Sequence, residues 1–182
     1  MIKFVAACLN IEQENICKKY NIEVIKNYVD SYGEIKQNCI TDFFVHCFNS
    51  EALKVLASLG VTRATLHPEL NLAQIRDIRK PIETEIIIYG KLPLMTLRTP
   101  RENGNLIDRR GMNFFIHNSI IYNSVPIFIA DKLNEIEKCG ISHGRLIFTT
   151  ETKEETENII KAYLHKKPLN IKFTRGKFYS RV

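Results

Sequence analysis

Residues 85–128 constrain the fold of this 182-residue chain more than any other stretch. The stretch opens with a β-branched run at residues 85–89, which is typical of a strand buried on both faces of a sheet. Gly90 and Pro93 end this run, and a long polar loop rich in lysine and arginine follows. A buried strand that leads into a polar loop is where α/β proteins place ligand-binding residues.

A strand–helix rhythm surrounds this stretch. From residue 42 onward the pattern predicts alternating strands and helices, at residues 42–48, 51–59, 61–67, 71–79, 85–89, 131–139, 145–149 and 152–165. A further strand is expected at residues 2–8, followed by a helix that Asn10 caps. Short loops between such elements favour parallel strands joined by right-handed crossovers. We therefore predict a single α/β domain over residues 1–182.

Composition excludes several classes of protein. Apolar residues make up 45% and charged residues 25% of the chain, which is ordinary for a soluble globular domain. No apolar run approaches ~18 residues, so neither a membrane span nor membrane binding is expected, and we find no signal peptide. The five cysteines are scattered without a CxxC pair. This pattern favours free thiols in a reducing cytoplasm over a zinc site or a disulfide scaffold.

The net charge of +6 is unevenly distributed. Residues 61–182 hold twenty lysines and arginines against thirteen acidic residues, and no acidic residue follows Glu157. Such a basic C-terminal half can bind RNA weakly through phosphate contacts, or it can be an ordinary solvated surface.

Five short blocks carry a family resemblance. In chain order they are TLHPEL at residues 65–70, YGKLPLM at 89–95, DRRG at 108–111, YNSVP at 122–126 and FTRGKFY at 173–179. They resemble the signature blocks of the collagenase-like peptidase family U32, which read roughly LSPEL, YGRLPLM, DRKG, NS-x-P and TRGxYY in the same order. The resemblance covers about residues 42–182, which match the C-terminal half of the family domain, whereas residues 1–41 match it poorly.

The resemblance implies a TIM-like (β/α) barrel and a peptidase or hydrolase activity. A complete barrel of this kind takes ~250 residues, so a chain of this length is expected to form a partial or open barrel. It would then bind a protein partner that supplies the missing strands, or a second copy of itself. The alternative functions are an accessory or binding subunit, or a component of an RNA-base or quinone hydroxylation system.

The chain departs from the family at its cysteines. Several branches of the family hold an iron–sulfur cluster with cysteines placed around these blocks. Residues 96–107 and 112–123 contain no cysteine here, and a cluster needs thiolate ligands. We therefore expect no iron–sulfur cluster, no other metal site and no cofactor.

The catalytic residues predicted from strand ends are Glu69, His67, Tyr89 and Lys91. Each lies at or just after the end of a predicted strand, where parallel barrels gather their functional residues. A carboxylate near an imidazole can perform acid–base chemistry. In the alternative, Glu69 accepts backbone hydrogen bonds and His67 only packs, and the family block has serine at the position of His67.

The predicted ligand-binding residues lie further along the chain. Arg109 or Arg110 could bind a phosphate or carboxylate, or could pair with Asp108 and order the loop. Asn123 and Ser124 could present amide and hydroxyl groups to a ligand, although a local turn explains them equally well. Arg175, in the last family block, completes this set. The sequence contains no legible Ser-His-Asp or Cys-His arrangement and no glycine-rich phosphate loop.

Overall fold

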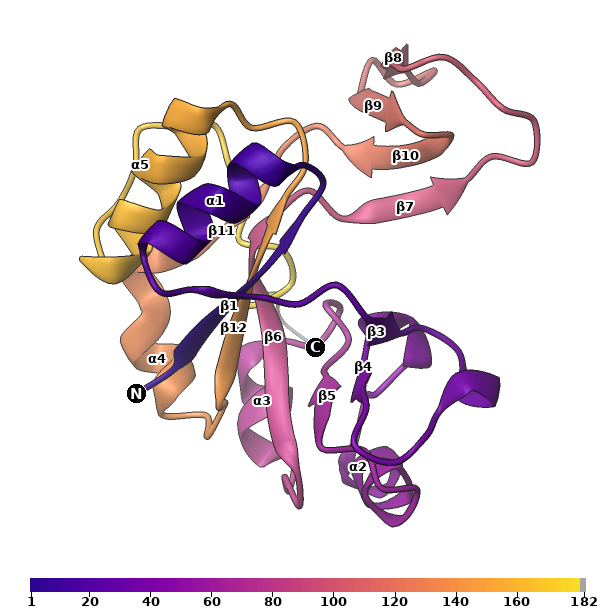
Figure 1. Cartoon of the computed structure of the whole chain (residues 1–182), viewed down its shortest axis with the longest axis vertical. Coiled ribbons are helices and arrows are strands. Elements are labelled where there is room, and N and C mark those ends of the chain that lie inside the picture. Colours follow the sequence, from indigo (N-terminus) through magenta and orange to yellow (C-terminus); the bar gives the residue numbers. More distant parts are fainter. Residues whose placement is uncertain (181–182) are drawn as a thin grey trace.

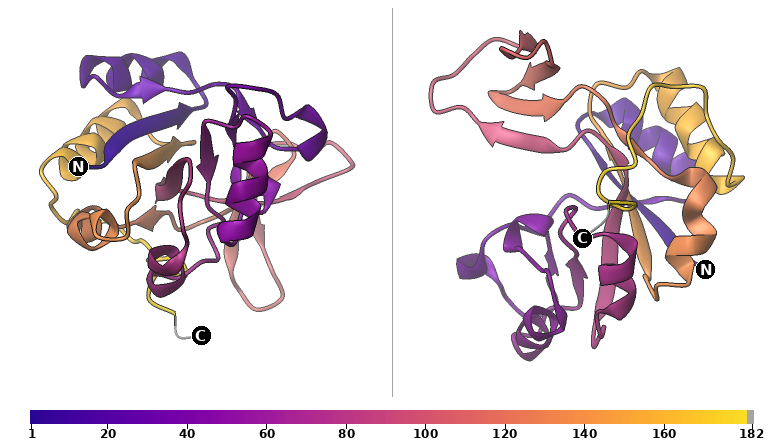
Figure 2. Two further views of the ribbon diagram at one scale, coloured as in Figure 1. Left: turned by 90° about the horizontal axis from the view of Figure 1, so that it is seen from below. Right: turned by 180° about the vertical axis from the view of Figure 1, so that it is seen from behind.

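The computed structural model describes residues 1–180 and has an α/β fold built around one curled sheet (Figure 1). The strand order is β2-β1-β12-β6-β5-β4-β3, all parallel, and β11 pairs antiparallel with β6. These strands are β1 (Lys3–Cys8), β2 (Glu23–Val24), β3 (Tyr28–Val29), β4 (Ile40–Thr41), β5 (Arg63–Thr65), β6 (Glu83–Gly90), β11 (Ile127–Phe128) and β12 (His143–Phe148). The sheet curls into a half-barrel, so the predicted α/β class and the open, partial barrel are confirmed (Figure 2).

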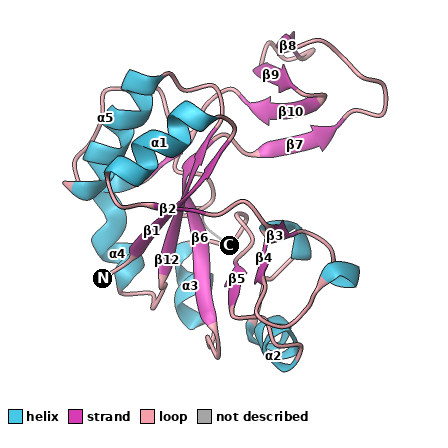
Figure 3. Ribbon diagram, in the orientation of Figure 1, coloured by secondary structure: helices cyan, strands magenta, loops and turns pink. Residues whose placement is uncertain are grey.

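Helices surround the curled sheet (Figure 3). The α-helices are α1 (Ile11–Lys19), α2 (Ser50–Ser58), α3 (Leu72–Asp77), α4 (Leu133–Glu137) and α5 (Lys153–Leu164), and short 3-10 turns lie at Tyr32–Glu34, Phe43–Val45 and Ala130–Lys132. Side-chain caps explain where most helices begin. Asn10, Asn49, Asn71 and Thr152 each accept a hydrogen bond from a backbone N–H in the first turn of the following helix. Thr152 and Glu155 form a capping box at the start of α5.

Tyr163 of α5 fixes this helix to the centre of the sheet. Its side chain is fully buried, and its hydroxyl donates to the Ile88 carbonyl at 2.5 Å and accepts from the Ile129 amide at 3.0 Å. Its ring also meets Phe4 of β1 edge-on, with the centroids 6.0 Å apart. A single side chain therefore joins α5 to β1, β6 and the segment after β11.

The two edges of the sheet are close together in sequence. β2 pairs with β1 and β3 pairs with β4, and only residues 25–27 separate these two edge strands. The chain thus passes directly from one edge of the half-barrel to the other. Among residues 1–180 no backbone pairing joins β2 to β3, so the ladder of hydrogen bonds stays open.

Two expectations from the sequence were wrong in detail. Residues 42–48 are not a strand, because Asp42 caps a 3-10 turn and His46 takes a left-handed conformation at φ 55°. The polar stretch after Gly90 is not one loop. It forms a second, antiparallel sheet in the order β7-β10-β9-β8, which projects from the end of β6 (Figure 1). Its strands are β7 (Pro93–Thr96), β8 (Gly104–Ile107), β9 (Asn113–His117) and β10 (Ile120–Asn123).

Candidate functional site

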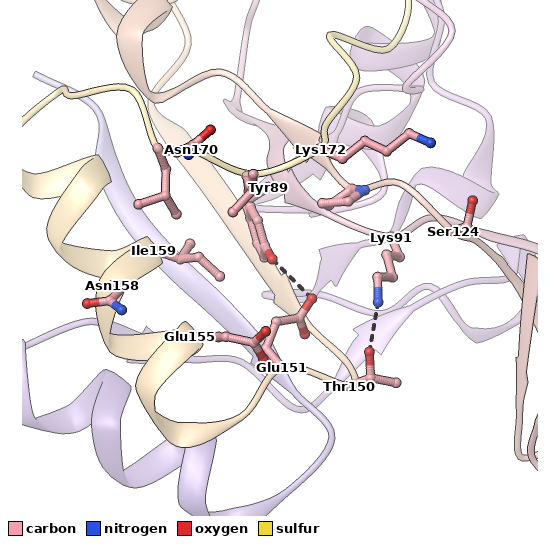
Figure 4. Close-up of a pocket in the computed structure, with 13 residues that line it drawn as sticks. Tyr89, Lys91, Ser124, Thr150, Glu151, Glu155, Asn158, Ile159, Asn170 and Lys172 are labelled. Carbon is pink, nitrogen blue, oxygen red and sulfur yellow. Dashed lines mark hydrogen bonds between the residues drawn. The ribbon is translucent and has the colours of Figure 1, made fainter.

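A cavity of about 490 Å³ lies where β6 and β12 end (Figure 4). Its walls come from four parts of the chain: the ends of these two strands, the segment between β10 and β11, one face of α5, and the C-terminal segment. The polar residues that line it are Tyr89, Lys91, Ser124, Thr150, Glu151, Glu155, Asn158, Asn170 and Lys172. Three of them, Tyr89, Lys91 and Ser124, are among the site residues predicted from the sequence.

Lys91 and Thr150 meet across the mouth of this cavity. β6 and β12 are parallel neighbours, so the residues that follow them emerge side by side. The Lys91 amine donates to the Thr150 hydroxyl oxygen at 2.8 Å and lies 4.7 Å from the centre of the Phe115 ring. Thr150 is exposed, so an amine and an accessible hydroxyl stand in contact beside a cavity.

Glu151 forms the deeper wall and is almost fully buried. One of its carboxylate oxygens accepts from the Tyr89 hydroxyl at 3.0 Å, and the other accepts from the Thr149 amide at 2.5 Å. Burial, together with the nearby Glu151 carboxylate, raises the pKa of Tyr89 well above its ordinary value, so the phenol stays protonated and donates.

Gln13 of α1 holds the loop at residues 149–151 by hydrogen bonds. Its side-chain amide donates to the carbonyl oxygens of Thr149 and Glu151 at 3.2 and 3.0 Å, and its own oxygen accepts from the Leu9 amide. Gln13 is 1% exposed, so the loop that carries Thr150 is held by a buried polar contact.

The two predicted residues that follow β5 do not line this cavity. The His67 ring stacks on Phe48, with centroids 4.2 Å apart, and its Nδ1 accepts from the Glu69 amide at 3.3 Å. Burial lowers the pKa of His67, which favours the neutral ring. Of the four predicted catalytic residues, Tyr89 and Lys91 therefore line the cavity. His67 packs against Phe48 outside it, and Glu69 is exposed.

Three of the predicted ligand-binding residues, Asp108, Arg109 and Arg110, lie between β8 and β9 of the projecting sheet. Asp108 accepts hydrogen bonds from the amides of Arg110 and Met112, both at 2.8 Å, and so closes the turn between β8 and β9. Within residues 1–180, neither Arg109 nor Arg110 has a carboxylate within 4.0 Å of its guanidinium. Asn123 ends β10, one residue before Ser124 enters the wall of the cavity.

Arg175 pins the C-terminal segment to the body of the fold. It forms a two-bonded ion pair with Asp131 at 2.5 and 2.9 Å and also donates to the Phe128 carbonyl at 3.0 Å. This guanidinium holds the pKa of Asp131 below its ordinary value.

Other basic side chains of the C-terminal half are also paired, including Lys161 with Glu157 and Lys166 with Glu137. Weak RNA binding by this half stays a prediction.

Replacing Arg175 by leucine tests this anchoring. Both side chains of the ion pair are only about a quarter exposed, so we expect the free energy of unfolding to fall by about 1 kcal/mol. Limited proteolysis after Lys172 should also become faster. Lys177→Leu, which removes an exposed charge from the same segment, is the control. Equal proteolysis rates for the two variants would show that Arg175 does not hold the segment.

A group of charged residues on the inner face of the half-barrel was not predicted from the sequence. Arg145 of β12 is 2% exposed, donates from Nε to Glu85 at 2.5 Å and from one terminal nitrogen to Asp42 at 3.1 Å, and also contacts Thr65. Its guanidinium lies 3.5 Å from the centre of the Tyr28 ring. Because β12 is not adjacent to β3, β4 or β5 in the sheet, these side chains can meet only across the inside of the curl.

A smaller cavity of about 170 Å³ lies over this charged group, with Arg145, Tyr28 and Asp42 in its wall. A signal for the group was present in the sequence. Titratable residues stand at alternate positions where β6 and β12 begin, as in Glu83-Thr84-Glu85 and His143-Gly144-Arg145, although residues 83–84 and 143–144 lie outside the strands predicted from the sequence. Such alternation indicates that one face of each strand is polar.

Residues 1–180 lack two features, a membrane-spanning helix and a cluster of metal ligands. No helix there is long and apolar enough to cross a membrane. No group of three or more His, Cys, Asp or Glu side chains in this range is arranged to hold a metal ion.

Among the comparisons with known proteins, one protein family matches part of the chain. The model of peptidase family U32 matches residues 16–100, just under half of the chain. The match includes the blocks at residues 65–70 and 89–95, whereas the three later blocks lie outside it. No curated protein and no solved structure gives a significant match. This match confirms the resemblance read from the sequence, since residues 16–100 are similar to peptidase family U32.

Proposed function

We propose that this chain is a hydrolase of the peptidase type that cleaves a peptide bond at the cavity beside α5. The observation that carries the proposal is the 2.8 Å contact between the Lys91 amine and the Thr150 hydroxyl. A hydroxyl next to a lysine amine is one of the known arrangements of a nucleophile and its base in acyl-transfer enzymes. The family's name supplies the same reaction class.

In this proposal Thr150 is the nucleophile and Lys91 is the general base. The Thr150 oxygen attacks the carbonyl carbon of the scissile bond while Lys91 takes the hydroxyl proton. Lys91 then gives that proton to the leaving amine, and water hydrolyses the resulting ester of Thr150. A lysine amine acts as a base when water is excluded from it, and a substrate lying in the cavity would exclude water from Lys91.

The remaining wall fits a peptide chain. Ser124, Asn158 and Asn170 offer hydroxyl and amide groups that can pair with backbone carbonyl and N–H groups. α5 begins three residues after Thr150, so the positive end of its dipole lies close to the attacked carbonyl. Glu151, held by Tyr89 and Thr149, keeps the Thr150 loop in place from the buried side.

We place this activity in the cytoplasm, and the cysteines support that location. All five are free thiols, and free thiols persist in reducing compartments.

Cleavage of fluorescence-quenched peptides and of denatured collagen tests the proposal. We expect Thr150→Ala and Lys91→Met each to lower kcat by about 100-fold or more, because each removes one member of a nucleophile–base pair. Thr150→Ser should keep measurable activity, since serine retains the hydroxyl. The controls are Thr99→Ala and Lys138→Met, two exposed substitutions outside the cavity, and both should behave as the wild type.

Two results would contradict the assignment. One is a wild-type chain that cleaves no member of the substrate pool above the buffer rate. The other is a Thr150→Ala variant that matches the wild type, which would move the reaction away from this cavity.

A further inference from the structure

Two cysteine sulfurs lie in contact near the start of the chain. Cys8 at the end of β1 and Cys17 on α1 have their Sγ atoms 3.7 Å apart. The five cysteines all fall within residues 1–180, and no other two of them share a hydrogen bond between their sulfurs. Cys17 is fully buried, whereas Cys8 is partly exposed and lines the smaller cavity above Arg145. A small oxidant can therefore reach Cys8 from the mouth of the half-barrel, and Cys17 stands directly behind it.

The two thiols share one hydrogen bond, which couples their ionisation. The contact with Cys17, assisted by burial, raises the pKa of Cys8, and the same contact lowers the pKa of Cys17 because a thiolate there accepts the Cys8 S–H. An ion pair between Glu14 and Lys26, at 2.7 Å, lies beside the pair and adds an acidic and a basic charge. One sulfur of the pair can thus carry a negative charge while the other keeps its proton.

We propose that Cys8 and Cys17 are a redox-modification site that closes reversibly into a disulfide when a peroxide reacts with it. The Cys8 proton first passes along the shared hydrogen bond to the Cys17 sulfur. The Cys8 sulfur, now a thiolate, attacks one peroxide oxygen, the O–O bond breaks, and Cys8 becomes a sulfenic acid while hydroxide leaves and takes up a proton from solvent. The Cys17 sulfur then attacks the sulfenic sulfur, the S–S bond forms, and a second water leaves with the Cys17 proton. Overall two thiols and one hydrogen peroxide give one disulfide and two waters. A dithiol reductant reverses the change.

The site is connected to the loop that carries Thr150. Gln13 lies one helical turn before Cys17 and therefore on the same face of α1. Gln13 holds the carbonyl oxygens of Thr149 and Glu151, and it accepts from the amide of Leu9, the residue after Cys8. A bond between Cys8 and Cys17 fixes α1 to β1 at this support. Any effect of the bond on hydrolysis rests on the proposed function, whereas the bond itself does not.

Oxidation of the intact chain tests the site. Reduced protein, freed of reductant, is treated with hydrogen peroxide, denatured, and analysed by thiol titration and peptide mass. We expect the loss of two of the five thiols. Lys3 and Lys18 bound one tryptic peptide that contains both cysteines, and this peptide should become two hydrogen atoms lighter and recover its mass with dithiothreitol.

Matched variants separate this site from general thiol damage. In Cys17→Ser the same peptide should gain oxygen instead of losing hydrogen, because no second sulfur resolves the sulfenic acid. Cys139→Ser should form the bond as the wild type does. Two results would overturn the proposal: oxygen addition to residues 4–18 of the wild type without loss of two hydrogens, or thiol loss that falls first on Cys139. Neither result depends on whether the chain cleaves peptides.

Discussion

Replacing Arg145 by methionine is expected to lower the free energy of unfolding by about 3–5 kcal/mol, which is enough to unfold many domains of this size. Glu85 is 0% exposed and receives hydrogen bonds from Arg145, Arg63 and Thr65. Removal of the Arg145 guanidinium leaves the Glu85 carboxylate buried with only one cation beside it. The cost comes mainly from this uncompensated charge, since a buried pair adds little over apolar side chains of the same volume.

A double variant distinguishes this cause from loss of packing. Denaturant unfolding followed by circular dichroism measures the single variant Arg145→Met, the single variant Glu85→Met and the double variant. The double variant should recover much of the loss, because no unpaired carboxylate remains. Arg76→Met, which removes an exposed partner of Asp77, is the control and should leave the midpoint unchanged. A double variant as unstable as the two losses added together would refute the charge argument.

The central architecture was predictable because its signals are local. The β-branched run at residues 85–89 forms most of β6, and residues 84–90 are buried, as a strand covered on both faces requires. The helices predicted at residues 51–59 and 152–165 are present as α2 and α5, where Asn49 and Thr152 cap the first turns. The family blocks and the length of the chain together predicted the partial barrel.

The second sheet escaped prediction although one signal for it was present. Asn118 and Ser119 both have positive φ, 49° and 61°, and form a two-residue turn between β9 and β10. Asparagine followed by a small polar residue between two apolar runs is a hairpin signal, but the surrounding basic residues favoured a loop. β7 and β8 are mostly exposed strands, so their composition resembles that of a loop.

Only part of the candidate site could be predicted from the sequence. Strand ends identified Tyr89 and Lys91, since the run of residues at 85–89 is easily read. Their partners Thr150 and Glu151 lie about sixty residues further along the chain and are brought near by the pairing of β6 with β12. Without a strand order, the sequence offered His67 and Glu69 as partners equally well.

The need for a second polypeptide stays a prediction. A partial barrel, as predicted from the sequence, leaves its edge strands without neighbours. In the structure the edge strands β2 and β3 are two residues each, and residues 25–27 connect them. The length of edge that a partner strand could extend is therefore short, and light scattering over a dilution series measures whether the chain associates.

Replacing Gly90 by alanine is expected to lower the free energy of unfolding by about 3 kcal/mol, from backbone strain combined with a steric clash. Gly90 has φ +131°, a conformation that residues with a side chain rarely adopt. A Cβ atom at this position would lie 2.5 Å from the Ile147 carbonyl oxygen and 2.7 Å from the Ile147 Cβ.

Neither atom near that Cβ can move away cheaply, because Ile147 lies within β12 and is paired there with Ala7 of β1. Relief would require the end of β6 to move away from β12. That movement would separate Lys91 from Thr150, so Gly90→Ala should lose peptide cleavage as well as stability if the proposed site is correct. Gly104→Ala is the matched control, because nothing lies within 4 Å of the Cβ it would add. A denaturant midpoint for Gly90→Ala equal to that of Gly104→Ala would show that the ends of β6 and β12 do not approach as closely as the structure has them.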